Sequence, residues 1–188
     1  MPANKPELYL TFDDGPVEGP TEFVLEELAK VSAKATFFCI GDNIRKHPHV
    51  FKKIVDAGHA IGNHTYNHIS GWKTPTPEYV SNTKKFDDQL SIANCKLSTV
   101  FRPPYGRITR SQIKALQHYK IIMWDVLSQD YDKDLSPEKC LHNTIRVTRP
   151  GSIIVFHDSF KAEKNLRYTL PRFVAHFLER GYTFKVIS

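Results

Sequence analysis

The stretch LYLTFDDGP (residues 8–16) is an apolar run that ends on two adjacent aspartates and a turn. The apolar part predicts a buried strand, and Gly15 and Pro16 predict the turn that ends it. Carboxylates this close repel each other, so they are usually separated or solvated. Asp13 and Asp14 therefore indicate either a polar turn or a site where a positive group makes both acids useful.

Extended apolar runs recur along the whole chain, and several are continuous rather than alternating. Continuous runs are typical of strands that are covered on both faces, as in parallel sheets. The predicted strands are residues 8–12, 35–40, 60–62, 99–101, 121–126, 152–156 and 183–187.

Helical patterns lie between these strands, within residues 21–31, 47–58, 78–93, 111–119, 137–147 and 170–180. Thr21 is the expected N-cap of the first helix, and Pro48 lies in the first turn of the second. Alternating strands and helices predict parallel α/β units, and about seven of them fit a closed barrel better than a short open sheet. We therefore expect the α/β class and a (β/α) barrel.

Length and composition predict one globular domain with a sizeable core, because the chain has 188 residues and 40% hydrophobic content. The net charge is +6, but basic residues form only short pairs such as Lys84-Lys85, which we interpret as solvated helix faces. We therefore expect no nucleic-acid partner, and we expect a monomer. No stretch approaches the ~20 apolar residues of a membrane span. The charged Glu7 interrupts any signal-peptide core near the N-terminus.

The three cysteines, Cys39, Cys95 and Cys140, are widely spaced, and the chain has no CxxC motif. This spacing excludes a disulfide framework and a zinc or redox motif of the CxxC type. Cys39 is expected to be a small buried apolar side chain. One disulfide beside one free thiol stays an open alternative.

Polar groups follow two of the predicted strands in the first half of the chain. His64 and His68 are four positions apart in GNHTYNH, so one helical turn would point both imidazoles the same way. Two prolines stiffen the loop FRPPYG, which can hold Arg102 and Tyr105 in fixed positions. The alternatives are surface or capping histidines and a tight turn with a surface arginine.

Polar groups also follow two later strands. The segment WDVLSQDYD offers Asp125, Asp130 and Tyr131, and the segment IIVFHD ends a buried strand on His157 and Asp158. A lone histidine at such a position is more often a hydrogen-bonded core residue than a catalytic one. However, a barrel brings the carboxyl ends of its strands together, and active sites gather there. The joint placement of acids, imidazoles and an arginine therefore favours a catalytic site.

Five of these segments resemble, in order, the motifs of the polysaccharide deacetylases, carbohydrate esterase family 4, which have a NodB-homology domain. The first motif is matched by TFDDGP, the second by HTYNH, the third by RPPYG, a degenerate fourth by SQDY and the fifth by VFH. The resemblance extends over residues 11–157. It implies a distorted (β/α) barrel of about seven strands, which agrees with the strand count. It also implies a single catalytic domain over residues 1–188.

Two motifs depart from the family pattern. The fourth motif usually reads D-S-x-D-W, whereas this chain has Leu127 and Tyr131 in place of its first aspartate and its tryptophan. The fifth usually begins with leucine, and here it begins with Val155. These residues line the substrate pocket in the family, as does Tyr105. The departures therefore concern substrate preference more than chemistry.

We expect Asp14, His64 and His68 to hold a divalent metal ion. Two nitrogens and one oxygen leave a position open for water, which is the pattern of a catalytic site. Zinc is the expected ion, and such a donor set also accepts cobalt, nickel or iron.

The resemblance implies a role for each remaining group. Asp13 would be the general base toward a water at the metal, and the backbone N–H of Tyr105 would stabilise the oxyanion. His157 would be the general acid that protonates the departing sugar amine. Arg102 would brace Asp13, while Asp130 would pair with His157 and raise its pKa.

The predicted reaction is removal of acetyl groups from N-acetylated amino sugars of a peptidoglycan- or chitin-like glycan. A metal-dependent amidohydrolase acting on a small amide, an O-acetyl esterase acting on xylan and a non-catalytic glycan-binding module stay open. Tyr105, Tyr131 and Trp72 favour a carbohydrate partner, because aromatic rings can flank a sugar. The compartment is open, although members of the family usually act at the cell envelope or outside the cell.

Overall fold

The structure, a computed structural model, describes residues 6–96 and 98–187. The first five residues, part of the segment in which we expect no signal peptide, lie outside the described residues. The strands of the described chain are β1 (Glu7–Asp13), β2 (Thr36–Cys39), β3 (Ala60–Asn63), β4 (Val100–Phe101), β5 (Lys120–Ile121), β6 (Val126–Leu127), β7 (Ile153–His157) and β8 (Thr183–Phe184).

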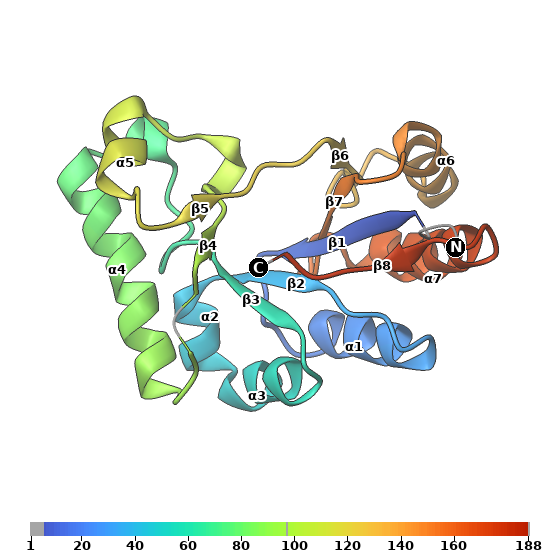
Figure 1. The fold of residues 1–188 in the computed structure, drawn as a ribbon, viewed down its shortest axis with the longest axis horizontal. Helices are drawn as coiled ribbons and strands as arrows, with labels where there is room; N and C mark the ends of the chain where they lie inside the picture. The colour runs from blue at the N-terminus through green and yellow to red at the C-terminus, as the bar shows by residue number, and fades with distance from the viewer. Residues whose placement is uncertain (1–5, 97, 188) are drawn as a thin grey trace, which may run out of the picture.

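These strands form a parallel sheet. Seven of them follow the path β5-β4-β3-β2-β1-β7-β6, and β8 pairs with the first residues of β1. Figure 1 shows the sheet curling into a half-barrel, with β5 and β6 at its two edges. The predicted α/β class and the distorted barrel of about seven parallel strands are confirmed.

The predicted strand at residues 121–126 is wrong, because the structure divides this run between two strands. β5 ends beside β4, and β6 begins beside β7 at the opposite edge of the path. The chain between them crosses the open side of the half-barrel (Figure 1), where Arg102 donates to the carbonyl oxygens of Ile122 and Met123 over 3.2 and 3.4 Å. An apolar run does not reveal that its two ends pair with different strands.

Helices follow most of the strands. They are α1 (Pro20–Lys30), α2 (Gly41–Lys46), α3 (Pro48–Asp56), α4 (Thr76–Ile92), α5 (Arg110–Ala115), α6 (Pro137–Val147) and α7 (Glu163–Leu178), with the 3-10 turns η1 (Gly71–Lys73) and η2 (Pro104–Gly106). The sequence did not predict the short α2. The N-cap of α1 is Gly19 and not Thr21, because the Thr21 hydroxyl donates to the buried carboxylate of Asp158 over 2.6 Å.

The last helix begins earlier than the sequence predicts, at residue 163 rather than 170. Proline is usually excluded from helix interiors, because it has no backbone N–H to donate. The helix nevertheless continues through Pro171, and its buried stripe includes Leu166, Leu170 and Phe173. Burial of that stripe against the sheet outweighs the cost of the proline.

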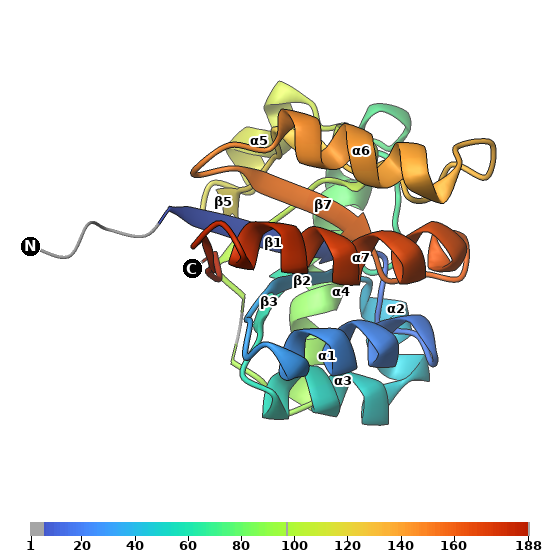
Figure 2. The same cartoon turned by 90° about the vertical axis from the view of Figure 1, so that its right-hand side faces the viewer.

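The centre of the core lies between the sheet and the outer helices. Phe12 of β1 is fully buried, and its ring stacks on those of Phe37 and Phe156 at centroid distances of 5.0 and 6.1 Å. Figure 2 shows α7 and α6 side by side over the outer face of β1 and β7, with α1 next to α7. This packing fixes the ends of β1 and β7, on which Asp13 and His157 lie.

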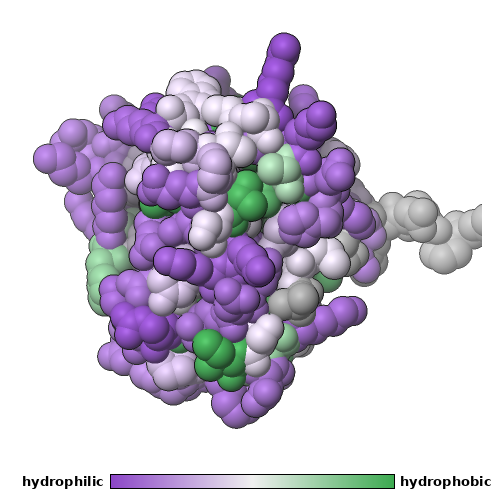
Figure 3. Space-filling model, turned by 90° about the vertical axis from the view of Figure 1, so that its left-hand side faces the viewer, coloured by the Kyte–Doolittle hydropathy of each residue, from purple (hydrophilic) through white to green (hydrophobic). Residues whose placement is uncertain are grey.

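The helices, the cysteines and the surface of the described chain are those expected of a globular protein. None of the helices in the described part of the chain is long and apolar enough to cross a membrane. Cys39, Cys95 and Cys140 are free, so the alternative of one disulfide does not hold in this structure. The face formed by α4 and α5 is mostly hydrophilic, with apolar side chains in small separate patches (Figure 3).

Replacing Phe12 with alanine should lower the free energy of unfolding by about 3–5 kcal/mol, because a fully buried ring is replaced by a cavity. Phe160 is 66% exposed, so Phe160→Ala is the matched control and should change stability by no more than ~0.5 kcal/mol. Urea denaturation measures both. Equal stabilities of the two variants would contradict the role of Phe12 at the centre of the core.

Candidate active site

Most of the predicted site residues line one pocket at the carboxyl ends of the strands. They are Asp13, Asp14, His64, His68, Tyr105, Tyr131, Val155 and His157. The two others, Arg102 and Asp130, are 0% and 1% exposed and form hydrogen bonds with Asp13 and His157. The fold therefore brings together residues from five different strand ends.

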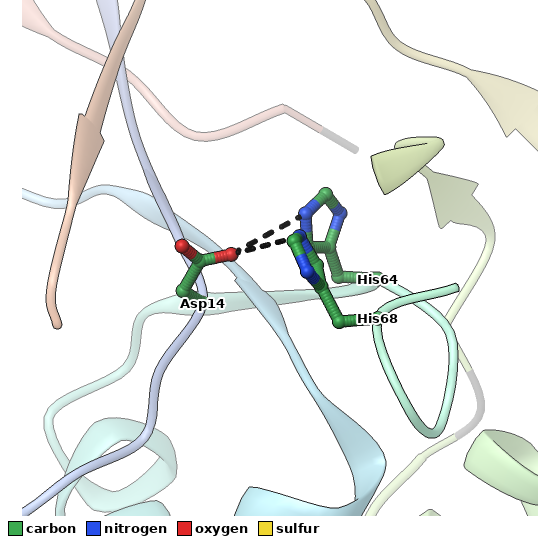
Figure 4. A group of neighbouring side chains, drawn as sticks. All are labelled: Asp14, His64 and His68. Carbon is green, nitrogen blue, oxygen red and sulfur yellow. Dashed lines mark ion pairs between the residues drawn. The ribbon is translucent and has the colours of Figure 1, made fainter. Parts of the chain in front are cut away.

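Asp14, His64 and His68 form a cluster in which each offers one ligand atom within 4.8 Å of the others. Oδ1 of Asp14 lies 3.7 Å from Nε2 of His64 and 3.1 Å from Nε2 of His68, and Figure 4 shows both rings facing this oxygen. Asp13 is the last residue of β1, whereas Asp14 follows it with φ 80°. This change of backbone direction separates the two carboxylates, so only Asp14 belongs to the cluster.

The two histidines do not lie on a helical turn, contrary to the interpretation of their spacing. They lie in an irregular loop after β3, where Thr65 and His68 adopt φ values of 63° and 55°. The ring centroids of His64 and His68 are nevertheless 5.1 Å apart. The loop conformation, rather than helical periodicity, brings the imidazoles together.

His64 is held in the form that a metal ion requires. Its ring is 2% exposed, and burial lowers the pKa of His64 to about 4, so the imidazole is neutral at pH 7. Its Nδ1 lies 2.8 Å from the carbonyl oxygen of Arg102, which can only accept a hydrogen bond. The proton is therefore on Nδ1, and Nε2 has its lone pair directed at the cluster.

The donor set fits a divalent cation. Oδ1 of Asp14 is buried and forms no hydrogen bond, and a buried carboxylate oxygen normally has a positive or donating partner. Burial alone would raise the pKa of Asp14, but the neighbouring imidazoles, foremost that of His68, lower it well below its usual range. An ionised carboxylate and two imidazole nitrogens are the ligands that zinc and similar metals prefer.

Asp13 is braced by a buried arginine. Nη1 of Arg102 donates to Oδ1 of Asp13 and to the Thr11 hydroxyl, each over 2.7 Å. The guanidinium also lies 4.1 Å from the ring centroid of Phe38. Oδ2 of Asp13 lies 4.0 Å from Nε2 of His64. One carboxylate oxygen is thus fixed by Arg102, and the other is left beside the metal-binding cluster.

His157 is braced by a buried acid. Oδ1 of Asp130 lies 2.7 Å from Nδ1 of His157, and Oδ2 accepts the backbone N–H of His157 over 2.8 Å. Burial alone would lower the pKa of His157, but the Asp130 carboxylate outweighs it and raises the pKa to about 9. The imidazole is therefore protonated at pH 7. With Nδ1 bound to Asp130, Nε2 is the nitrogen available to a ligand.

The aromatic groups form the walls of the pocket. Tyr105 and Gly106 both adopt left-handed φ values, 61° and 65°, and a Cβ on Gly106 would lie 2.9 Å from the Trp124 ring. This turn places the exposed Tyr105 ring 4.6 Å from that of His68. On the other wall, the ring of Tyr131 lies edge-on to His157 at 5.0 Å.

Two buried polar residues hold the loops of the site: Asn63, which sequence reasoning missed, and Asp158, which it named without a role. Asp158 accepts hydrogen bonds from the Gly15 N–H (3.0 Å) and the Thr21 hydroxyl, and it thereby fixes the turn after Asp14. Oδ1 of Asn63 accepts the Thr65 N–H over 2.8 Å and fixes the loop between the histidines. Each stands directly beside a predicted site histidine in the sequence, which is the signal that could have revealed it.

One acid that the sequence offered for the site lies outside it. The Asp125 carboxylate accepts hydrogen bonds from the Ser152 hydroxyl and the Ile153 N–H, both over 2.7 Å. It therefore ties the chain before β6 to the start of β7. Leu127 of the fourth motif also lines the pocket, and so do three residues that the sequence did not indicate, which are Arg107, Trp124 and Lys161.

The fold and the site together define a class of protein, the parallel α/β half-barrels with a candidate metal cluster at the strand ends. Beside that cluster lie an aspartate and a histidine that are each held by a buried charged partner. A family model described as polysaccharide deacetylase matches residues 1–124. The chain therefore belongs to the polysaccharide deacetylase family, a family of hydrolases.

Two sequence relatives and one solved structure illustrate this relationship. Two peptidoglycan-N-acetylglucosamine deacetylases of Bacillus cereus are 38% identical over 160 residues and 30% identical over 196 residues. These alignments cover 84% and 100% of this chain, and 58% and 89% of the two relatives. The crystal structure of the Bc1960 peptidoglycan N-acetylglucosamine deacetylase matches with a TM-score of 0.92 and 33% identity, over 99% of this chain and 88% of that one.

Replacing His68 with alanine should weaken Zn²⁺ binding at least about tenfold, because the cluster loses one of its three ligands. His142 is exposed on α6, so His142→Ala is the matched control and should bind Zn²⁺ like the unmodified protein. Isothermal titration calorimetry measures both affinities. Equal affinities would show that the cluster does not hold the metal.

Proposed function

We propose that this protein is a metal-dependent deacetylase that removes acetyl groups from N-acetylated amino sugars of a peptidoglycan- or chitin-like glycan. The observation that carries the proposal is the pairing of Asp13 with Arg102 and of His157 with Asp130 around one cluster of ligands. Amide hydrolysis needs a base for water and an acid for the leaving nitrogen. The pocket holds a candidate for each.

Asp14, His64 and His68 would hold the divalent ion, with zinc as the expected metal and cobalt, nickel or iron as alternatives. Such an ion, when bound, supplies Lewis acidity toward water and toward the carbonyl oxygen of the acetamide. Asp13 would take the proton of the attacking water on Oδ2, since Oδ1 is engaged by Arg102. The brace keeps this carboxylate in one orientation, which is what a general base requires.

His157 would donate its proton from Nε2 to the nitrogen of the departing sugar amine. An amine leaves readily only when it is protonated, and His157 carries a proton at pH 7 because of Asp130. The backbone N–H of Tyr105 would stabilise the negative charge on the carbonyl oxygen during attack. The products would be acetate and a free amino sugar.

The glycan would enter between the two aromatic walls. Tyr105 and Tyr131 would flank the sugar, and Val155 and Leu127 would contact it from the strand ends, since all four line the pocket. The names of the relatives given above describe deacetylation of N-acetylglucosamine in peptidoglycan. This supports an N-acetylated amino sugar as the substrate over an acetylated xylan. It also supports action at the cell envelope. We further propose that residues 1–188 form a single catalytic domain.

Two other functions are less well supported. A small amide would leave the aromatic walls of the pocket without a partner. A non-catalytic glycan-binding module would not need the braces on Asp13 and His157, because binding alone requires neither a fixed base nor a protonated imidazole. Acetate release from N-acetylglucosamine oligomers, and not from small acetamides, separates the proposal from both.

Replacing Asp13 with asparagine should lower acetate release by about 10² or more, because the amide accepts no proton from water. Zn²⁺ content should persist, because Asp13 is not one of the three ligands. Asp134 is exposed, so Asp134→Asn is the matched control and should keep full activity. Unaltered turnover in Asp13→Asn would refute its role as the base.

Replacing Asp130 with asparagine should lower the pKa of His157 from about 9 by about one unit or more, because burial then acts without the opposing carboxylate. The acid must be protonated to act, so the fall of kcat at high pH should move to lower pH. Imidazole NMR of the metal-free protein and pH–rate profiles measure the two effects. Asp132→Asn, in the same loop but exposed, is the control. An unchanged titration in Asp130→Asn would contradict this role.

A further inference from the structure

The mouth of the pocket carries two positively charged side chains that the proposed mechanism does not use. Arg107 follows η2, on the β4 side of the sheet, and Lys161 follows β7. Three strands separate β4 from β7 in the sheet order, so the two cations stand on opposite walls. Both side chains are exposed and are therefore accessible to a ligand.

Neither cation is neutralised by an acid of the protein. Within residues 6–96 and 98–187, no ion pair includes Arg107 or Lys161, whereas other surface cations such as Lys53 have acidic partners. Instead, the Arg107 guanidinium lies 5.2 Å from the Trp72 ring centroid, and the Lys161 ammonium lies 5.0 Å from that of Tyr131. A ring holds a cation in place without removing its charge.

The acids inside the pocket do not compensate these charges. Asp13 is paired with Arg102, and Asp14 faces the imidazoles of His64 and His68. The positive charge at the mouth therefore remains available for a ligand. Two unpaired cations on opposite walls create a field that attracts anionic groups toward the opening.

A neutral glycan would gain little binding energy from the mouth of the pocket. It would gain by stacking on aromatic rings, but a cation already covers one face of Trp72 and one face of Tyr131. A carboxylate attached to the sugar would instead meet an arginine or lysine that has no other partner. The arrangement therefore favours an acidic glycan over a neutral one.

We propose that Arg107 and Lys161 select glycans whose amino sugars carry a carboxylate beside the acetamide, as N-acetylmuramic acid does in its lactyl group. Neutral N-acetylglucosamine polymers would be poorer substrates. This inference rests on the proposed deacetylase function and names the substrate class of the same site. Arg107 and Lys161 are specificity residues that act in binding, and neither takes part in proton transfer.

The test compares two substrates that differ only in charge. One is a glycan fragment of alternating N-acetylglucosamine and N-acetylmuramic acid with free lactyl carboxylates, and the other is the same fragment with those carboxylates amidated. Acetate release by the zinc-loaded protein should favour the acidic fragment about tenfold in kcat/KM at low salt, mainly through KM. The preference should fade toward unity near ~0.5 M NaCl, because salt screens exposed charges.

The double variant R107Q/K161Q should lose most of this preference, to within about twofold. Two matched controls carry the same substitutions far from the pocket. Arg172→Gln removes an arginine that lies 3.9 Å from the Tyr168 ring on α7, and Lys84→Gln removes an exposed lysine of α4. Both should keep the preference of the unmodified protein. An equal rate on the two fragments, or an unchanged preference in the double variant, would overturn the inference.

Failure of the deacetylase proposal would give a different experimental result. If neither fragment releases acetate, the same fragments and variants are compared by their dissociation constants in titration calorimetry. Tighter binding of the acidic fragment, lost in R107Q/K161Q, would support the charge selection without catalysis. Equal dissociation constants would overturn the charge selection as well.

Discussion

The buried ion pair between Arg102 and Asp13 is the constraint on which the rest of the site depends. Arg102 is fully buried in the half-barrel, and its donors reach the end of β1 and the chain that links β5 to β6. Taking a guanidinium and a carboxylate out of water is costly, so each must be satisfied by the other. The backbone of the same residue accepts the Nδ1 proton of His64. One arginine thus sets the orientation of a candidate base and of a candidate metal ligand.

Other groups of the site are likewise held in place by buried hydrogen-bonding partners. Asp130, from the loop after β6, holds both the ring and the backbone of His157. Asp158 holds the turn after β1, and Asn63 holds the loop between the two histidines. Asp130 and Asp158 each come from a different segment than the chain they orient, whereas Asn63 directly precedes the loop it fixes. A proton-transfer group must keep a narrow geometry, and such cross-links supply it.

Charge is distributed differently in the interior of the pocket and at its mouth. Inside, Asp13 is paired with Arg102 and Asp130 with His157. Asp14 faces two imidazoles, and that of His64 is neutral at pH 7. At the mouth, two cations rest on aromatic rings and have no acidic partner among the described residues. Arg107 and Lys161 lie outside the five motifs that carry the family resemblance. In the proposed function, chemistry would depend on the interior residues and substrate choice on the two cations at the mouth.

The sequence by itself determined the fold class, most of the elements and the residue types of the candidate site, because continuous apolar runs and polar strand ends are local patterns. It misjudged the run at residues 121–126, the start of α7 and the cap of α1, because distant partners decide each of them. The convergence of His64 and His68 also depends on an irregular loop that periodicity does not describe. Asp158 matters through its hydrogen bonds to Gly15 and Thr21. Only the tertiary structure decides such contacts, because they join segments far apart in the sequence.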